Sequence, residues 1–189
     1  MTISLAIDTA TSRTIVAVIE SQNDQGDQQN QSDQKVLFEA FHDGATDHGR
    51  ALSELVGKAL ARFPHIDLVV VGMGPGPFTG LRVGISFAQS FALARDIALV
   101  GVCSLDAIKI DQSQYTVGVD ARRHEIYWAS YEGGVRVEGP SVSKPSEVLG
   151  CITDLFPDMV KLVQLSKTQN VKEPMYLRRP DAIATVDRT

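Results

Sequence analysis

The chain has 189 residues, of which 43% are hydrophobic and 22% are charged, so it is long enough to bury the core of one large domain or two small ones. Its formal net charge of −5 and its pI of about 5.3 give no overall attraction for a polyanion, which argues against nucleic-acid binding by this chain alone. With two isolated cysteines, no 18-residue apolar stretch and no signal-peptide pattern, the sequence favours a soluble, cytoplasmic protein without a disulfide framework.

The first elements predicted along the chain are strands. Three short segments rich in β-branched or aromatic residues and bounded by turn formers indicate an antiparallel meander: residues 3–7, 14–19 and 35–41. Between the second and the third lies a polar low-complexity run, residues 21–34, which predicts an exposed hairpin extension.

Helices and buried strands alternate in the next part of the chain. Apolar residues at helical spacing predict a helix from Thr46 or Asp47 to residue 63, where Pro64 ends it. A continuous apolar run, residues 67–72, predicts a strand buried on both faces of a sheet. A second helix over about 79–95 and a second buried strand follow, the strand at residues 98–102.

The pattern then restarts. Residues 5–20, LAIDTATSRTIVAVIE, are echoed by residues 117–132, VGVDARRHEIYWASYE, with Asp8 and Asp120 in matching places. We therefore predict an α/β protein of two tandem ribonuclease-H-like lobes, as in the actin and Hsp70 superfamily of ATPases. The expected lobes are residues 1–104 and a reduced second lobe, 105–189, in which KPSEVLG starts a helix and MVKLVQL forms a strand.

A glycine-rich loop, GMGPGPFTGLRVG, joins the buried strand at residues 67–72 to the second helix. Its position suits a phosphate, because backbone N–H groups and the helix dipole attract anions there. However, Pro75 and Pro77 carry no N–H, and neither the GxxxxGK[ST] nor the GxGxxG spacing is present. The sequence thus favours another role for the loop.

The second helix carries a stripe of small residues at a spacing of four: Gly80, Gly84, Ala88 and Ala92. Glycine in a helix interior costs about 1 kcal/mol relative to alanine, so close approach by another segment is expected. One interpretation places the neighbouring helix of the same lobe on this surface. The other is an intermolecular helical interface, for which the candidate residues are Leu52, Leu55, Ala59, Gly80, Arg82, Gly84 and Ala88.

Catalytic chemistry is weakly supported by the residue pattern. A nuclease would need carboxylates around Asp8, and a metal site would need a histidine four residues after His48, where Leu52 stands. Asp8, Thr9 and Thr11 are candidates for residues near a nucleotide, although a phosphate-binding turn would carry a glycine there. We predict no catalytic residue and no metal ligand. The basic pairs are interpreted as solvated surface groups: Arg122 with Arg123, and Arg178 with Arg179.

Five segments resemble the bacterial TsaB (YeaZ) family: IDTATS, GPGPFTGLRVG, VGVCSLDA, VDARRHEIYWASY and YLRRPDA. The resemblance spans residues 3–140 and about 174–182, and family members are usually longer between the last two segments. It implies two actin-like lobes in a subunit that is not itself the catalyst. Such subunits pair with a metal- and substrate-binding paralogue, TsaD, and a TsaE ATPase joins the complex, which transfers threonylcarbamoyl to adenosine 37 of tRNA.

The resemblance also sets expectations for partners. It implies an interface on the two helices of the first lobe, tRNA contact only through the complex, and a homodimer when the chain is alone. No intrinsic cofactor is expected, and the partner interface is a candidate place for ATP or ADP. Two alternatives stay open: an autonomous ATPase or kinase of the actin-like superfamily, and a peptidase acting on the paralogue.

Overall fold

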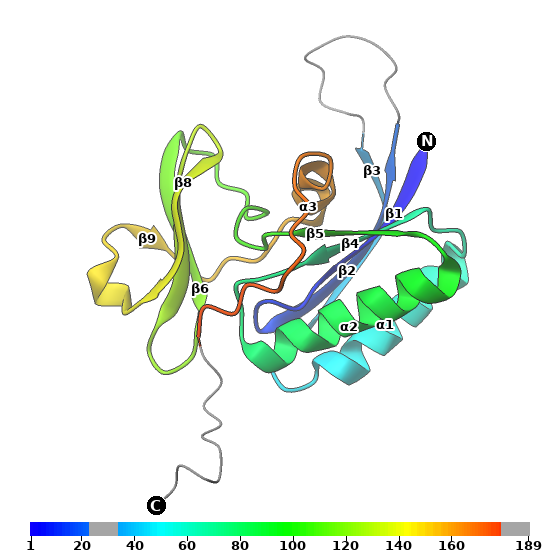
Figure 1. Cartoon of the computed structure of the whole chain (residues 1–189), viewed down its shortest axis with the longest axis horizontal. Helices are drawn as coiled ribbons and strands as arrows, with labels where there is room; N and C mark the ends of the chain where they lie inside the picture. Colours follow the sequence, from blue (N-terminus) through cyan, green and yellow to red (C-terminus); the bar gives the residue numbers. More distant parts are fainter. Residues whose placement is uncertain (23–33, 179–189) are drawn as a thin grey trace, which may run out of the picture.

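The computed structural model describes residues 1–22 and 34–178 and contains two sheets. The first has the order β3-β2-β1-β4-β5 (Figure 1). Its first three strands are antiparallel, and β4 and β5 run parallel to β1, which is the ribonuclease-H-like arrangement that the sequence predicts. The strand bounds are β1 Thr2–Asp8, β2 Arg13–Ser21, β3 Gln34–Asp43, β4 Leu68–Gly72 and β5 Ala98–Val102.

Helices cover both faces of this sheet. The helices α1 (His48–Arg62) and α2 (Phe78–Arg95) lie side by side on one face, and their buried apolar residues complete the largest core cluster. The helix α3 (Met159–Leu165) covers the opposite face. The strands between the two layers are therefore buried on both sides, which explains their continuous apolar runs.

The strand predicted for MVKLVQL is wrong, because this segment is α3. Met159, Leu162 and Val163 are buried, and their spacing of three and four places them on one helical face. Asp158 caps the helix by accepting a hydrogen bond from the backbone N–H of Lys161 at 2.8 Å. A short apolar run does not distinguish a strand from a helix by periodicity alone.

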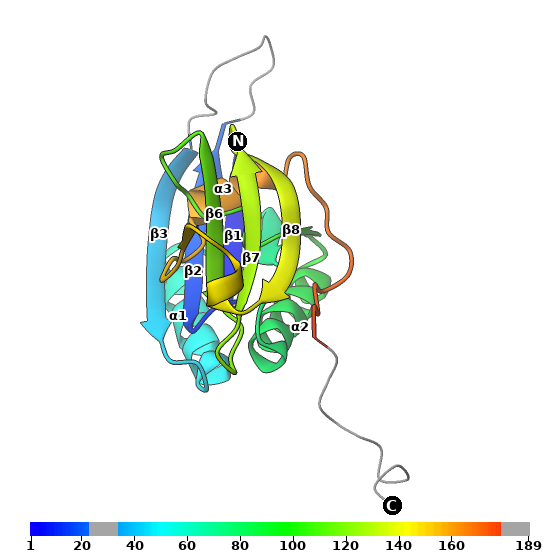
Figure 2. The same ribbon diagram turned by 90° about the vertical axis from the view of Figure 1, so that its left-hand side faces the viewer.

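The second sheet has the order β8-β7-β6-β9 and is viewed face-on in Figure 2. Its hairpin β6–β7 repeats β1–β2, since Asp120 pairs with Ile126 as Asp8 pairs with Ile15. KPSEVLG forms only a short 3-10 helix, Pro145–Glu147, so the helix expected to start there does not form. The strand bounds are β6 Gln114–Asp120, β7 Ile126–Glu132, β8 Val135–Ser143 and β9 Cys151–Ile152.

The polar run 21–34 is described only at its two ends. Of the polar run 21–34, the structure describes residues 21, 22 and 34, which belong to or flank the ends of β2 and β3; the rest lies outside the described residues. In the described part of the chain, no helix combines the length and hydropathy needed to cross a membrane.

Candidate functional site

The turn after β1 is built around a buried carboxylate. Asp8 accepts hydrogen bonds from the backbone N–H of Ala10 at 2.8 Å and from the hydroxyl of Ser104 at 2.6 Å. A Cβ at Gly72 would collide with this carboxylate, so glycine is needed opposite it. Burial raises the pKa of Asp8 to about 6, against the lowering effect of its two hydrogen bonds. Asp8 thus holds the turn in place from inside the protein.

The small-residue stripe of α2 receives this same turn. The Thr9 hydroxyl donates to the carbonyl oxygen of Gly80 at 2.8 Å, and a Cβ at Gly80 would lie 2.7 Å from the Thr9 carbonyl oxygen. A Cβ at Gly84 would collide with the Thr9 side chain, and one at Gly76 would collide with the carbonyl oxygen of Ala10. The glycines of the loop and helix therefore let α2 pass closely over the turn of its own lobe.

This packing corrects the placement of the expected interface residues. Gly80, Gly84 and Ala88 face inward, and so do three α1 residues that fill the same core: Leu52, Leu55 and Ala59. These six residues pack in the interior of the first lobe and are not on its surface. Of the seven candidates, Arg82 is the one whose side chain is exposed.

The residues expected near a nucleotide are also covered. Asp8 and Thr9 are buried, and Thr11 is 7% exposed. Thr11 lines a cavity of about 320 Å³ between the lobes, together with Asp120, Glu125 and Asp154. Carboxylates repel phosphate groups. The structure thus does not gather the three predicted residues into an open phosphate site.

Metal ligands do not gather either in the part of the chain that the structure describes, where no three His, Cys, Asp or Glu side chains are placed to hold an ion. His48 lies instead at the start of α1 with its ring nitrogen Nδ1 2.8 Å from the Thr14 hydroxyl. Burial, together with the nearby Arg122 charge, lowers the pKa of His48. This histidine packs inside the first lobe.

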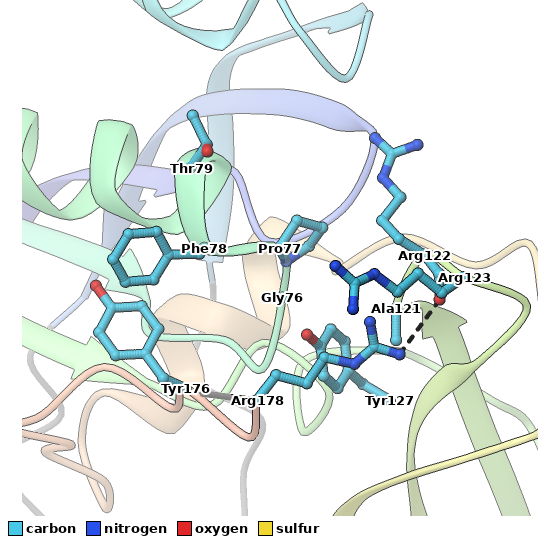
Figure 3. A pocket seen from close by; sticks show the side chains of 10 residues that line it. All are labelled: Gly76, Pro77, Phe78, Thr79, Ala121, Arg122, Arg123, Tyr127, Tyr176 and Arg178. Atoms are coloured by element: carbon cyan, nitrogen blue, oxygen red, sulfur yellow. Dashed lines mark hydrogen bonds between the residues drawn. The ribbon is translucent and has the colours of Figure 1, made fainter. Parts of the chain in front are cut away.

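A basic pocket of about 370 Å³ lies where the lobes meet (Figure 3). Its first wall is the segment 76–79, which leads into α2, where first-turn amides lack partners within the helix. Arginines and tyrosines from two distant segments form the others: Arg122, Arg123 and Tyr127 from one, Tyr176 and Arg178 from the other. This arrangement attracts anions.

Sequence reasoning missed this pocket, because it treated each basic pair alone. Only the fold brings Arg178 next to the hairpin turn that carries Arg122 and Arg123. Arg179, the other member of the second pair, lies outside the described residues. The one usable sequence signal was that the basic pairs belong to two of the five family-like segments, VDARRHEIYWASY and YLRRPDA.

The turn that carries two of these arginines has an unusual backbone. Arg122, Arg123 and His124 have φ angles of 63°, 56° and 59°, in the left-handed region that glycine favours. Each such residue costs about 1 kcal/mol or more, so its surroundings must hold it. Asp120 does so in part, by accepting a hydrogen bond from the Arg122 backbone N–H at 2.8 Å.

A second small-residue stripe lies on α1 and is exposed. It consists of Gly49, Ser53, Gly57 and Ala61, again at a spacing of four. Apart from chain neighbours and the nearby backbone of α1 itself, no described atom lies within 4 Å of a Cβ built at Gly49 or Gly57. The same spacing rule that selected the α2 stripe would have found this one in the sequence.

On α2, the exposed side chains border a shallow cavity of about 400 Å³ that is lined by Phe78, Thr79, Arg82, Val83 and Ser86. The Arg82 guanidinium lies 4.9 Å from the centre of the Phe78 ring. Since α1 and α2 lie side by side, we name the α1 stripe and these five α2 residues together the helical face.

Comparison with known proteins gives a match over most of the chain. Residues 42–184 match the family model described as TsaD, tRNA N6-adenosine threonylcarbamoyltransferase. An uncharacterized protein of Mycobacterium tuberculosis H37Rv is 36% identical over 94% of this chain and 92% of its own length. A Mycobacterium leprae relative is 37% identical over 96% of this chain, which spans 56% of that protein. The Escherichia coli threonylcarbamoyladenosine biosynthesis protein TsaB is 37% identical over 35% of the chain.

Two solved structures from Pseudomonas aeruginosa share the fold. One, described as similar to the peptidase YeaZ, superimposes with a TM-score of 0.72 at 21% identity, covering 94% of this chain and all of that one. The other, YeaZ, has a TM-score of 0.64 at 22% identity and covers 88% of this chain and 91% of its own. At such identities, the likeness concerns the fold alone.

Proposed function

This chain belongs to the TsaB (YeaZ) family, and from that membership we propose that it is a non-catalytic subunit in the biosynthesis of threonylcarbamoyladenosine in tRNA. It acts by binding a TsaD-type paralogue through the helical face. The complex, and not this chain alone, transfers threonylcarbamoyl to adenosine 37. Differential binding is the mechanism: the subunit stabilises the partner state that holds the threonylcarbamoyl donor, an adenylate, together with the tRNA.

The exposed stripe on α1 is the observation that carries this proposal. Glycines in a helix interior cost about 1 kcal/mol each, and in α2 the contacts with Thr9 offset that cost within the chain. In α1, Gly49 and Gly57 meet nothing among the described residues. A helix from another protein that packs closely on this bare stripe would supply the missing compensation.

The rest of the complex follows from the family. A TsaE-type ATPase joins it, tRNA is contacted through the complex, and the helical face of a second copy takes the paralogue's place when the chain is alone. ATP or ADP is held at the partner interface. The basic pocket supports a nucleotide at the interface, because Phe78 and Thr79 line both the pocket and the helical face. The complex assembles in the cytoplasm.

The alternatives have weaker support in the geometry. An actin-like ATPase needs an open phosphate site at the first turn, where Asp8 and Thr9 are buried. A peptidase needs an activated nucleophile, and burial raises the pKa of Cys103 to about 12. ATP turnover by the isolated chain above background, lost in Asp8→Ala, would favour the first. Cleavage of the paralogue during prolonged incubation would favour the second.

The experiment that tests the proposal is sedimentation of the chain mixed with the TsaD-type paralogue. Gly57→Leu places a bulky side chain on the bare stripe, and we expect at least tenfold weaker association because two helices can no longer approach closely. The thermal midpoint of the chain should not fall, since leucine is a better helix former than glycine.

Lys109→Leu is the matched control, because this exposed residue lines a cavity beside α3, on the other face of the first sheet. It should assemble like the wild type. Equal affinity of Gly57→Leu and wild type for the paralogue would contradict the proposed docking surface. Failure of the wild type to bind would reject the proposed function as a whole.

A further inference from the structure

The segment that follows α3 runs back across the first lobe before it reaches the second. Within residues 171–178, which we name the strap, the backbone N–H of Val171 donates to the carbonyl oxygen of Gly101 at 2.8 Å. A Cβ at Gly101 would collide with the Val171 carbonyl oxygen, so the approach needs glycine. Met175 then donates to the carbonyl oxygen of Met73 at 2.9 Å. The strap thus lies along the outer edge of β5 (Figure 1).

The strap next contacts the helical face. The ring of Tyr176 lies 4.8 Å from the ring of Phe78, centre to centre, and Figure 3 shows the two rings side by side at the start of α2. Both side chains are about 40% exposed. A partner helix on α2 would therefore meet the strap where Phe78 supports it.

The strap ends on the left-handed turn of the second lobe. The Arg178 guanidinium forms an ion pair with Glu125 and donates to the carbonyl oxygen of Arg122 at 3.4 Å, the dashed line in Figure 3. The backbone N–H of Glu125 donates to the same carbonyl oxygen at 3.1 Å. Arg178 therefore contacts Arg122, the first of the three residues with positive φ, and Glu125, which directly follows the third.

These contacts form one path from the first sheet, past α2, to the basic pocket. We propose that the strap holds the left-handed turn in place from the first lobe, with Arg178 as the positioning residue that keeps Arg123 directed at the pocket. A turn with three left-handed residues has a backbone cost that its own bonds only partly offset, so external contacts decide how rigid it is. Detaching the strap frees the turn.

This coupling makes the strap a regulatory device. A change in the contact at Phe78 also changes the rigidity of the turn at Arg122, because Tyr176 and Arg178 lie two residues apart in the strap. This consequence rests on the proposed function only for the identity of the partner. The strap itself is testable on the isolated chain, so the two proposals fail separately.

The test is amide hydrogen exchange resolved by NMR on the full chain, comparing Arg178→Ala and Tyr176→Ala with wild type. The amides of Ala121 and Glu125 report on the turn, because each donates within it. We expect both variants to exchange at least tenfold faster at these two amides. Tyr176→Ala is the more specific test, because Tyr176 contacts Phe78 and can affect the turn only through the strap.

Controls separate positioning from general destabilisation. Lys172→Ala removes an exposed strap side chain and should leave exchange unchanged. Glu125→Ala combined with Arg178→Ala should have no more effect than Arg178→Ala alone, because Arg178→Ala already removes the ion pair. Unchanged exchange in Arg178→Ala would overturn the proposal, and so would equally faster exchange over all of β6 and β7. Faster exchange in Arg178→Ala but not in Tyr176→Ala would mean that only a local ion pair holds the turn, and this result would also overturn the proposal.

Discussion

At the scale of the residue, the two matching aspartates show how environment changes the role of one motif. Asp8 and Asp120 each follow a strand and accept a hydrogen bond from the backbone N–H two residues on, at 2.8 Å in both cases. Asp8 is fully buried beside Gly72 and Ser104, whereas Asp120 is exposed and lies 3.7 Å from the Arg122 guanidinium. The sequence repeat predicted that the two aspartates occupy equivalent positions. Only the structure shows that Asp8 is a core group, whereas Asp120 lines the cavity between the lobes.

The raised pKa of Asp8 predicts a pH dependence of stability. Its folded-state pKa, about 6, lies above the ordinary value of 3.8, so the native state holds a proton that the unfolded chain has released. Stability from this group is therefore present below pH 4 and is lost as the pH rises to about 6, with a magnitude of about 3 kcal/mol. Asp8→Asn should flatten the free energy of unfolding between pH 4 and 7, measured by urea titration. The exposed Asp120→Asn is the control, and parallel pH profiles for wild type and Asp8→Asn would contradict the prediction.

At the scale of the element, α1 and α2 carry the same four-residue pattern with opposite orientations. The stripe of α2 faces the turn at Thr9, and that of α1 faces away from the chain. Spacing along a helix establishes that small residues share a side, but it does not say which side meets the sheet. The flanking residues of α1 decide this: Leu52, Leu55 and Ala59 are buried, so the stripe is directed outward.

The two stripes predict opposite effects of one substitution. Gly84→Ala should destabilise the chain by about 1 to 3 kcal/mol, because its methyl group would overlap the Thr9 side chain. Gly57→Ala should stabilise it by about 1 kcal/mol, since it improves helix propensity in open space. Thermal unfolding of both variants at equal concentration is the measurement. A neutral Gly84→Ala would mean that α2 moves away from the turn at little cost.

At the scale of the whole molecule, segments from the second half of the sequence complete the first lobe. Besides α3 and the strap, Phe156 stacks on the Arg13 guanidinium at 3.9 Å from the ring centre. Asp106 joins the halves, because Tyr131 donates to its carboxylate at 2.9 Å and the Gln169 amide does so at 2.9 Å. The lobes are therefore tied together by packing and by hydrogen bonds.

A truncation tests whether residues 1–104 and 105–189 are separate folding units. A chain ending at residue 104 lacks α3, which covers the apolar face formed by Ala6, Ala17 and Val70. We expect such a chain to aggregate or to unfold without a cooperative transition, as judged by sedimentation and thermal circular dichroism. The full chain is the control. A monomeric fragment with a sharp transition would show instead that the first lobe folds alone.

The sequence by itself determined the meander, the two long helices, the buried strands and the repeated aspartate turn, because these follow from periodicity and turn chemistry within about 20 residues. It also carried the five segments of the family. Only the tertiary structure decided that the α2 stripe faces Thr9, that MVKLVQL is a helix on the first sheet, and that Arg178 meets Arg122 and Arg123. Each of these depends on which distant segment lies opposite, and close packing between segments far apart in the chain leaves no periodic signal in either one.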